Sequence, residues 1–269
     1  MVQRAKKASG GERKFAVDLP RSLTWRRNRP APPPPGQPDA KELAQRMRQF
    51  EIFARLPDAL LLKLAASASI RVFRAGEYLW HQDEPNNRVL FIERGLAKTS
   101  RRIRAGLTRT YGLYGPGDSM GIYAIWAGMK YPTDALALND GMTAIALSPE
   151  ALVECAKNQP LLSATLIAEI GRFTESFIRK IEIVSAGTVP QRMAALLLWL
   201  LERYGTQSPD GKANLPIYLT LEHIGEIVDA RVETVARALG DWKRRSWLTM
   251  DGDGFHFERF DLVRALLPE

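Results

Sequence analysis

The hydrophobic pattern of this 269-residue chain changes its period twice, and this change constrains the fold most strongly. Apolar residues recur every three or four positions over 41–68, as they do on one face of a helix. From 70 to 147 they gather in short runs between turn residues, and from 160 onward the helical spacing returns. The order predicts an α+β protein in which a β-rich unit is followed by a helical one.

The segment 41–68 is predicted to form two short helices, because Pro57 disfavours helix at the residue before it. Strands are predicted at the four apolar runs 78–80, 89–92, 110–114 and 144–147. Many short strands separated by turns rich in Gly, Pro and Asn predict an antiparallel sandwich or roll.

One long helix is predicted over 160–186. Its apolar stripe consists of Leu162, Leu166, Ile170, Phe173, Phe177, Ile181 and Val184. A stripe this narrow usually faces a partner helix, so we expect a homodimer formed through it. The alternative is that the helix packs on the roll of its own chain, for which a wider stripe is expected.

The last segment predicts a winged helix-turn-helix. Helices are expected at 190–204, 220–228 and 232–245, a strand at 215–219, and a hairpin at 248–257 that turns on Asp251-Gly252-Asp253-Gly254. Thr220 is expected to cap the first helix of the motif. Asp229 occupies the turn, where it tolerates a positive φ better than most residues do.

The second helix of this motif carries side chains that suit DNA. Its N-terminal end is the part of a recognition helix that meets base edges in the major groove. Glu accepts a hydrogen bond from cytosine, Arg donates two to guanine, and Ala contacts the thymine methyl group. The expected DNA-binding residues are Thr220, Arg231, Val232, Glu233, Thr234, Ala236, Arg237, Lys243 and Arg244, the last two for phosphates. The alternative for Glu233 and Arg237 is a helix-surface ion pair.

On these features the chain resembles the CRP/FNR family of bacterial transcription factors over about 43–265. The run that carries the resemblance is Val232-Glu233-Thr234-Val235-Ala236-Arg237. It implies a cyclic-nucleotide-binding-type antiparallel β-roll, a long dimerisation helix and a C-terminal winged helix-turn-helix. The expected division is a disordered basic and Pro-rich tail at 1–40, a sensor domain at 41–155, the dimerisation helix at 156–187 and a DNA-binding domain at 188–269.

Within the family, Val232 before Glu233 is similar to the FNR branch, which reads TTGAT half-sites. Ala236 replaces the Ser of that branch's pattern, and Arg231 stands where the family usually has a Ser/Thr cap. The family's cyclic-nucleotide cassette is degenerate here. Ser119 replaces the Glu that would bind ribose, Thr133 replaces the Arg that would pair with phosphate, and Asp134 would repel an anion. We therefore expect no response to cyclic AMP.

Aromatic residues are dense in the predicted roll. One interpretation is that they pack the core of the roll and suit its strands. The alternative is that they line a pocket for an apolar or aromatic effector. A third possibility is that the roll binds no effector. The candidate pocket residues are Ser119, Met120, Tyr123, Trp126, Tyr131, Thr133, Asp134 and Phe177.

Charge and cysteine content narrow the class of protein. The net charge is +8, and residues 1–29 contribute most of it, with nine Lys/Arg against two Asp/Glu. This basic tail is interpreted either as a solubilising leader or as an arm that binds nucleic acid non-specifically. The single Cys excludes a disulfide framework and an all-cysteine iron–sulfur cluster within one chain. The three His are scattered along the sequence, so we expect no metal and no cofactor. The weak alternative is a metal ion or a haem bound at His81. No nucleotide loop or hydrolase motif predicts an enzyme. No apolar run of membrane-spanning length and no secretory leader are found, so a cytoplasmic location is expected.

The leading hypothesis is thus a homodimeric regulator that binds a palindromic DNA site with TTGAT-like half-sites. Its expected partners are DNA and a second copy, with RNA polymerase left open, the effector unknown and no membrane. The alternative is a small-molecule sensor that acts through protein–protein contacts and binds DNA weakly. The composition of 188–269, ten Lys/Arg and twelve Asp/Glu, motivates this alternative.

Overall fold

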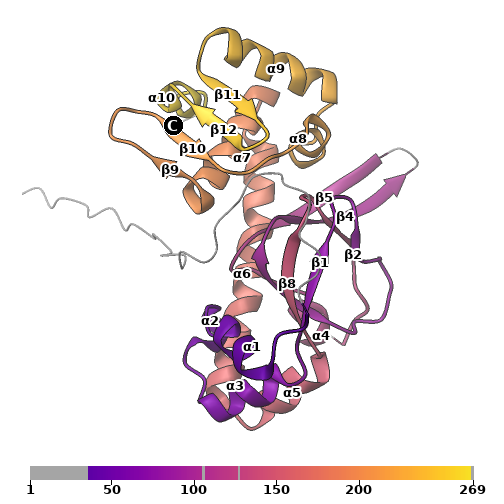
Figure 1. The fold of residues 1–269 in the computed structure, drawn as a ribbon. Helices are drawn as coiled ribbons and strands as arrows, with labels where there is room; N and C mark the ends of the chain where they lie inside the picture. Colours follow the sequence, from indigo (N-terminus) through magenta and orange to yellow (C-terminus); the bar gives the residue numbers. More distant parts are fainter. Residues whose placement is uncertain (1–35, 105–106, 127, 268–269) are drawn as a thin grey trace, which may run out of the picture.

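The structure is a computed structural model that describes residues 36–104, 107–126 and 128–267 (Figure 1). The tail expected at 1–40 therefore lies outside the described residues, apart from its last five. The chain folds as a β-roll beside a long helix, with a smaller α/β unit at the far end of that helix (Figure 1). The predicted fold class is confirmed.

Within the described residues, from 36 onward, three short helices precede the roll: α1 (Ala40–Met47), α2 (Glu51–Ala54) and α3 (Asp58–Ala65). The break at Pro57 is confirmed. A second break, between α1 and α2, was not predicted; there the backbone of Phe50 is extended, with φ −87° and ψ 134°. The ring of buried Phe50 lies against Phe91 of the roll, 5.4 Å between centroids, so this break lets the side chain enter the core.

The roll consists of two four-stranded antiparallel sheets. One has the order β1 (Ser69–Phe73), β8 (Met142–Leu147), β3 (Val89–Arg94), β6 (Ser119–Met120). The other has the order β2 (Tyr78–Trp80), β7 (Asp134–Ala137), β4 (Ala97–Arg104), β5 (Leu107–Tyr114). The four predicted strands are confirmed as β2, β3, β5 and β8. The remaining strands of the roll and the helices α4 (Ile122–Trp126) and α5 (Pro149–Lys157) were not predicted.

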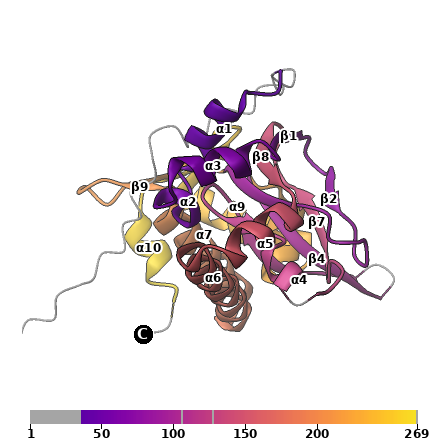
Figure 2. The same ribbon diagram turned by 90° about the horizontal axis from the view of Figure 1, so that it is seen from below.

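The long helix is confirmed as α6 (Pro160–Ser185). Figure 2 looks nearly along it and shows the strands of the roll to one side. The expectation that its whole apolar stripe faces a partner is wrong, because Leu162 and Leu166 are fully buried in the core of their own chain. They belong to a core cluster that also holds apolar residues of α2, α4 and α5, three helices that all contact α6. The exposed isoleucines of α6, Ile167, Ile178 and Ile181, lie on another face.

The C-terminal unit contains α7 (Val189–Tyr204), β9 (Thr206–Gln207), β10 (Ala213–Leu215), α8 (Leu221–Val228), α9 (Val232–Arg244), β11 (Leu248–Asp251), β12 (Gly254–Phe257) and α10 (Phe260–Arg264). The helices and the two-residue hairpin turn agree with the prediction. The strand predicted at 215–219 is wrong: β10 ends at Leu215, because the next residue, Pro216, has no N–H to donate to a sheet. β9 and α10 were not predicted.

Candidate nucleic-acid interface and effector cavity

The helix-turn-helix begins with a reciprocal cap at Thr220. Its hydroxyl accepts a hydrogen bond from the backbone N–H of His223 at 3.1 Å, and its own N–H donates to Nδ1 of His223 at 3.4 Å. This capping box satisfies two N–H groups that the first turn of α8 would leave unpaired. At the other end Asp229 is left-handed, with φ 53° and ψ 51°, which confirms the conformation expected for the turn.

One face of α9 is buried and the other is open. Val235, Ala238, Leu239 and Trp242 lie in the core of the C-terminal unit. Glu233 and Arg237 are exposed on the opposite face, with Val232, Thr234 and Ala236 half-buried beside them. Within the described part of the chain, neither Glu233 nor Arg237 makes a hydrogen bond or an ion pair, so the surface-pair alternative is not observed. Both side chains are available to a ligand.

The remaining expected DNA-binding residues lie around α9. Arg231 is exposed at its N-cap position without capping through its side chain. Lys243 and Arg244 are exposed at the C-terminal end, and Arg244 pairs with Asp241 at 3.3 Å. Thr220 is half-buried, and its hydroxyl is used by the cap.

The turn between α8 and α9 is held from its inner side by three cations, a set that the sequence analysis missed. The carboxylate of Asp229 pairs with Arg109 of β5 and lies 3.6 Å from the amino group of Lys180 on α6. Lys180 also donates to the carbonyl of Ile227, and Arg192 of α7 donates to the carbonyl of Val228 at 3.1 Å. These are the last carbonyls of a helix, where its dipole favours positive charge.

One cation of this set, Lys180, is itself largely buried. Burial lowers the pKa of Lys180 to about 8, against the opposing effect of the Asp229 carboxylate. A signal for these contacts exists in the sequence, because Lys180 is a cation within the apolar repeat of the long helix. Its partner could not be identified, since the sequence does not place α8 beside α6.

A cavity lies between the roll and α6. Of the candidate effector residues, Ser119, Met120, Tyr123, Tyr131 and Thr133 line it. Trp80, Tyr114, Glu169 and Phe173 also line it and were missed. The side chain of Trp126 lies outside what the structure describes.

Two candidate effector residues do not line the cavity. The carboxylate of Asp134 accepts a hydrogen bond from the backbone N–H of Gln82 at 2.9 Å and lies 3.5 Å from the ring of His81. Phe177 stacks on Tyr111, 5.8 Å between centroids. The aromatic residue of α6 at the cavity is Phe173, one helical turn earlier, which stacks on Tyr123 at 5.0 Å.

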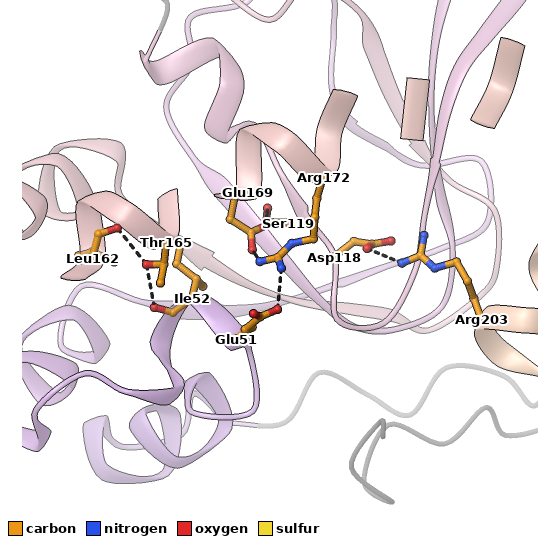
Figure 3. A network of polar contacts seen from close by, with 9 residues as sticks. All are labelled: Glu51, Ile52, Asp118, Ser119, Leu162, Thr165, Glu169, Arg172 and Arg203. Atoms are coloured by element: carbon orange, nitrogen blue, oxygen red, sulfur yellow. Dashed lines mark hydrogen bonds and ion pairs between the residues drawn. The ribbon is translucent and has the colours of Figure 1, made fainter. Parts of the chain in front are cut away.

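The negative charge at the cavity comes from Glu169, not from Asp134. The side chain of Glu169 is 6% exposed, accepts a hydrogen bond from the hydroxyl of Ser119 at 2.5 Å and pairs with Arg172 (Figure 3). Arg172 also binds Glu51 at 2.6 Å. Glu169 thus lines the cavity with a buried carboxylate that is ion-paired with Arg172.

The residue just before the strand that carries Ser119 contacts the C-terminal unit. Asp118, the preceding residue, pairs with Arg203 of α7 at 2.6 Å (Figure 3). Burial alone would lower the pKa of Arg203, but the carboxylate of Asp118 raises it above its usual value. Two consecutive residues thus contact α6 at the cavity and α7 in the unit that carries α9.

Within the described residues, no group of three or more His, Cys, Asp or Glu could hold a metal ion. No helix among those residues is long and apolar enough to span a membrane.

Two families of known domains match this chain. The cyclic nucleotide-binding domain family matches residues 70–159, and the Crp-like helix-turn-helix domain family matches residues 191–262. A CRP-like cAMP-activated global transcriptional regulator of Mycobacterium tuberculosis is 28% identical over 180 residues, covering 67% of this chain and 80% of the relative. The transcriptional activator protein Anr of Pseudomonas aeruginosa is 25% identical over 190 residues, covering 69% of this chain and 75% of the relative.

A solved structure shows the same fold. FixK2 from Bradyrhizobium japonicum matches with a TM-score of 0.65 at 19% identity, covering 75% of this chain and 98% of that one. The two matched domains, their order along the chain and the exposed face of α9 lead to one conclusion. The chain belongs to the CRP/FNR family of transcriptional regulators and carries a Crp-like helix-turn-helix DNA-binding domain.

Proposed function

We propose that this protein acts as a homodimer on a palindromic DNA site with TTGAT-like half-sites. The observation that carries the proposal is the pair of exposed side chains Glu233 and Arg237, one turn apart at the N-terminal half of α9 and without partners in the described structure. An unpaired Arg at this place is suited to guanine, and Glu to cytosine. Ala236 between them presents a methyl group that suits thymine.

The proposed dimer forms through a heptad face of α6. Ile167, Gly171, Thr174, Ile178, Ile181 and Ser185 are all exposed and alternate at spacings of four and three. This is the spacing that a left-handed pair of helices requires. Ile167, Ile178 and Ile181 are 65%, 52% and 53% exposed in the single chain, which is unusual for Ile. A second copy would cover them, and its two-fold symmetry would give a palindromic site.

The cavity supports an effector other than cyclic AMP. Glu169 places a carboxylate at the cavity, and Thr133 supplies no cation for a phosphate. Aromatic side chains form much of the remaining lining, which suits a neutral, apolar or aromatic molecule. Asp118 and Ser119 would carry its effect from the cavity to α7, because an effector that changes the Ser119–Glu169 contact also changes the residue beside Asp118.

The test measures binding of the protein to two duplexes that differ only at the guanine of one half-site. In the wild type, replacing that guanine should cost about 1–3 kcal/mol, roughly 5- to 150-fold in affinity. Arg237→Ala should bind both duplexes equally. Arg264→Ala is the matched control, because this exposed Arg lies in α10, on another element of the same unit. A preference for guanine that survives in R237A would contradict the assignment.

The alternative, an output through protein–protein contacts, is favoured only by the acidic balance of 188–269. The dependence of DNA affinity on salt concentration distinguishes the two functions. Phosphate contacts lose affinity steeply as salt rises, whereas weak binding without salt dependence would favour the alternative.

A further inference from the structure

The hairpin of β4 and β5 carries an unbalanced positive charge. Between Lys98 and Gly117 the sequence has five cations and no Asp or Glu. Arg101 and Arg102 are exposed, and neither has an ion-pair partner within the described residues. Like charges gathered on one element disfavour the folded state, so exposed cations without counter-charges, such as these two, indicate an anionic ligand.

The register of the hairpin places one of these residues beside the helix-turn-helix. Arg101 is directly opposite Arg109 in the β4–β5 pairing, so their side chains share one face of the hairpin. Arg109 pairs with Asp229, in the turn before α9. Arg101 is therefore about one strand spacing, ~5 Å, from the residue that contacts this turn.

A second contact fixes the hairpin to the same unit. Lys98 at the base of β4 pairs with Glu226 of α8, and its side chain is only 7% exposed. Figure 1 shows the hairpin projecting beyond the rest of the roll on the side of α8. The face with Arg101 and Arg109 thus has a fixed position relative to α9.

The side chains of the neighbouring residues Arg101 and Arg102 point to opposite faces of the hairpin. Successive residues of a strand point to opposite faces, so Arg102 points away from the face that Arg101 shares with Arg109. Arg109 itself is already paired with Asp229. Among the side chains that the structure describes on this face, Arg101 is thus the cation that is exposed and has no counter-charge.

We propose that the Arg101 face of the hairpin binds backbone phosphates of the duplex that flanks the half-site read by α9. The inference rests on the proposed function, because it requires α9 to be docked on DNA. A duplex that continues beyond the half-site offers a regular row of anions, and the guanidinium fork matches phosphate geometry. An acidic protein surface is the competing ligand for the same charge.

The experiment compares two duplexes at near-physiological salt. One ends at the edges of the selected palindrome, and the other extends about one helical turn, ~10 base pairs, beyond each edge. The variant is Arg101→Ala. Arg102→Ala removes the same charge from the opposite face, and Arg55→Ala removes it from the end of α2, at the far end of the molecule from α9 (Figure 1).

The wild type should bind the long duplex several-fold more tightly than the short one. R101A should lose this gain, keep its affinity for the short duplex, and show a salt dependence weaker by about one phosphate contact per subunit. R102A and R55A should behave as wild type. The proposal is overturned if R101A keeps the gain, as it would with an acidic protein as ligand, or if R102A loses as much, which would indicate a general field.

A different result would contradict the proposed function itself. In that case the wild type binds neither duplex above a scrambled sequence, and the inference falls with it. A wild type that prefers the palindrome but gains nothing from the flanks contradicts the inference alone.

Discussion

Asp229, the left-handed residue that ends α8, lies 3.6 Å from the amino group of Lys180 on α6. The helix that carries the proposed dimer seam is thus in direct contact with the turn before the recognition helix. Arg109 contacts the same carboxylate from the roll. The turn that leads into α9 is therefore held by side chains from both the roll and α6, which links the roll physically to this helix.

The pKa of Lys180 predicts an increase in stability at alkaline pH. Its folded value is about 8 and its ordinary value is 10.5, so between these the unfolded chain binds more protons than the folded one. The free energy of unfolding then rises with pH through this window. We expect a gain of roughly 2–3 kcal/mol between pH 7.5 and 10 relative to Lys180→Met, measured by urea denaturation. Parallel pH profiles of the two proteins would contradict the assignment.

Ile178→Glu should dissociate the dimer. A charge at a seam position appears twice in a symmetric interface, and burying each Ile is worth about 2 kcal/mol. We expect the dimer dissociation constant to rise at least ~100-fold in analytical ultracentrifugation, with the fold kept by circular dichroism. Leu62→Glu, at an exposed apolar position of α3, is the control and should leave the dimer intact. A dimeric I178E would place the interface elsewhere.

Gly171 separates helix stability from dimer contact. A Cβ added at Gly171 meets nothing within 4 Å in the single chain, and Ala is favoured over Gly inside a helix by about 0.5–1 kcal/mol. Gly171→Ala should therefore stabilise an isolated subunit. If Gly171 allows close approach of two helices at the seam, the same variant should weaken the dimer. A stabilised subunit with an unchanged or tighter dimer would remove Gly171 from the seam.

Glu169 predicts the response of the cavity to cyclic AMP. The wild type should bind cyclic AMP more weakly than about 1 mM in isothermal titration, because the buried carboxylate repels the phosphate. Glu169→Gln removes this charge and releases Arg172 from its ion pair, so its affinity should be higher than that of the wild type. Micromolar binding by the wild type would contradict the account of the cavity.

The sequence predicted the elements whose pattern is local. The period of α6, the break at Pro57, the cap at Thr220 and the turn at Asp229 all follow from neighbouring residues. The end of β10 could also have been predicted, since Pro216 follows Leu215. The apolar residues of 215–219 favoured a strand there instead.

The sequence could not reveal contacts between distant segments. Which face of α6 is buried depends on α2, α4 and α5, and therefore the buried Leu166 was assigned to the same stripe as the exposed Ile181. Phe177 was predicted to lie at the cavity, but Phe173 lies there. This error also arose because the packing of α6 against the roll could not be predicted. Glu169 was missed because its role depends on Ser119, fifty residues earlier, rather than on any local motif.

The most direct test of the central claim is selection of bound sequences from a random duplex library by the purified protein, without added ligand and at near-physiological salt. The account predicts enrichment of a palindrome with TTGAT-like arms about one helical turn apart, centre to centre. A single asymmetric motif, or no enrichment above that of the R237A variant, would contradict it.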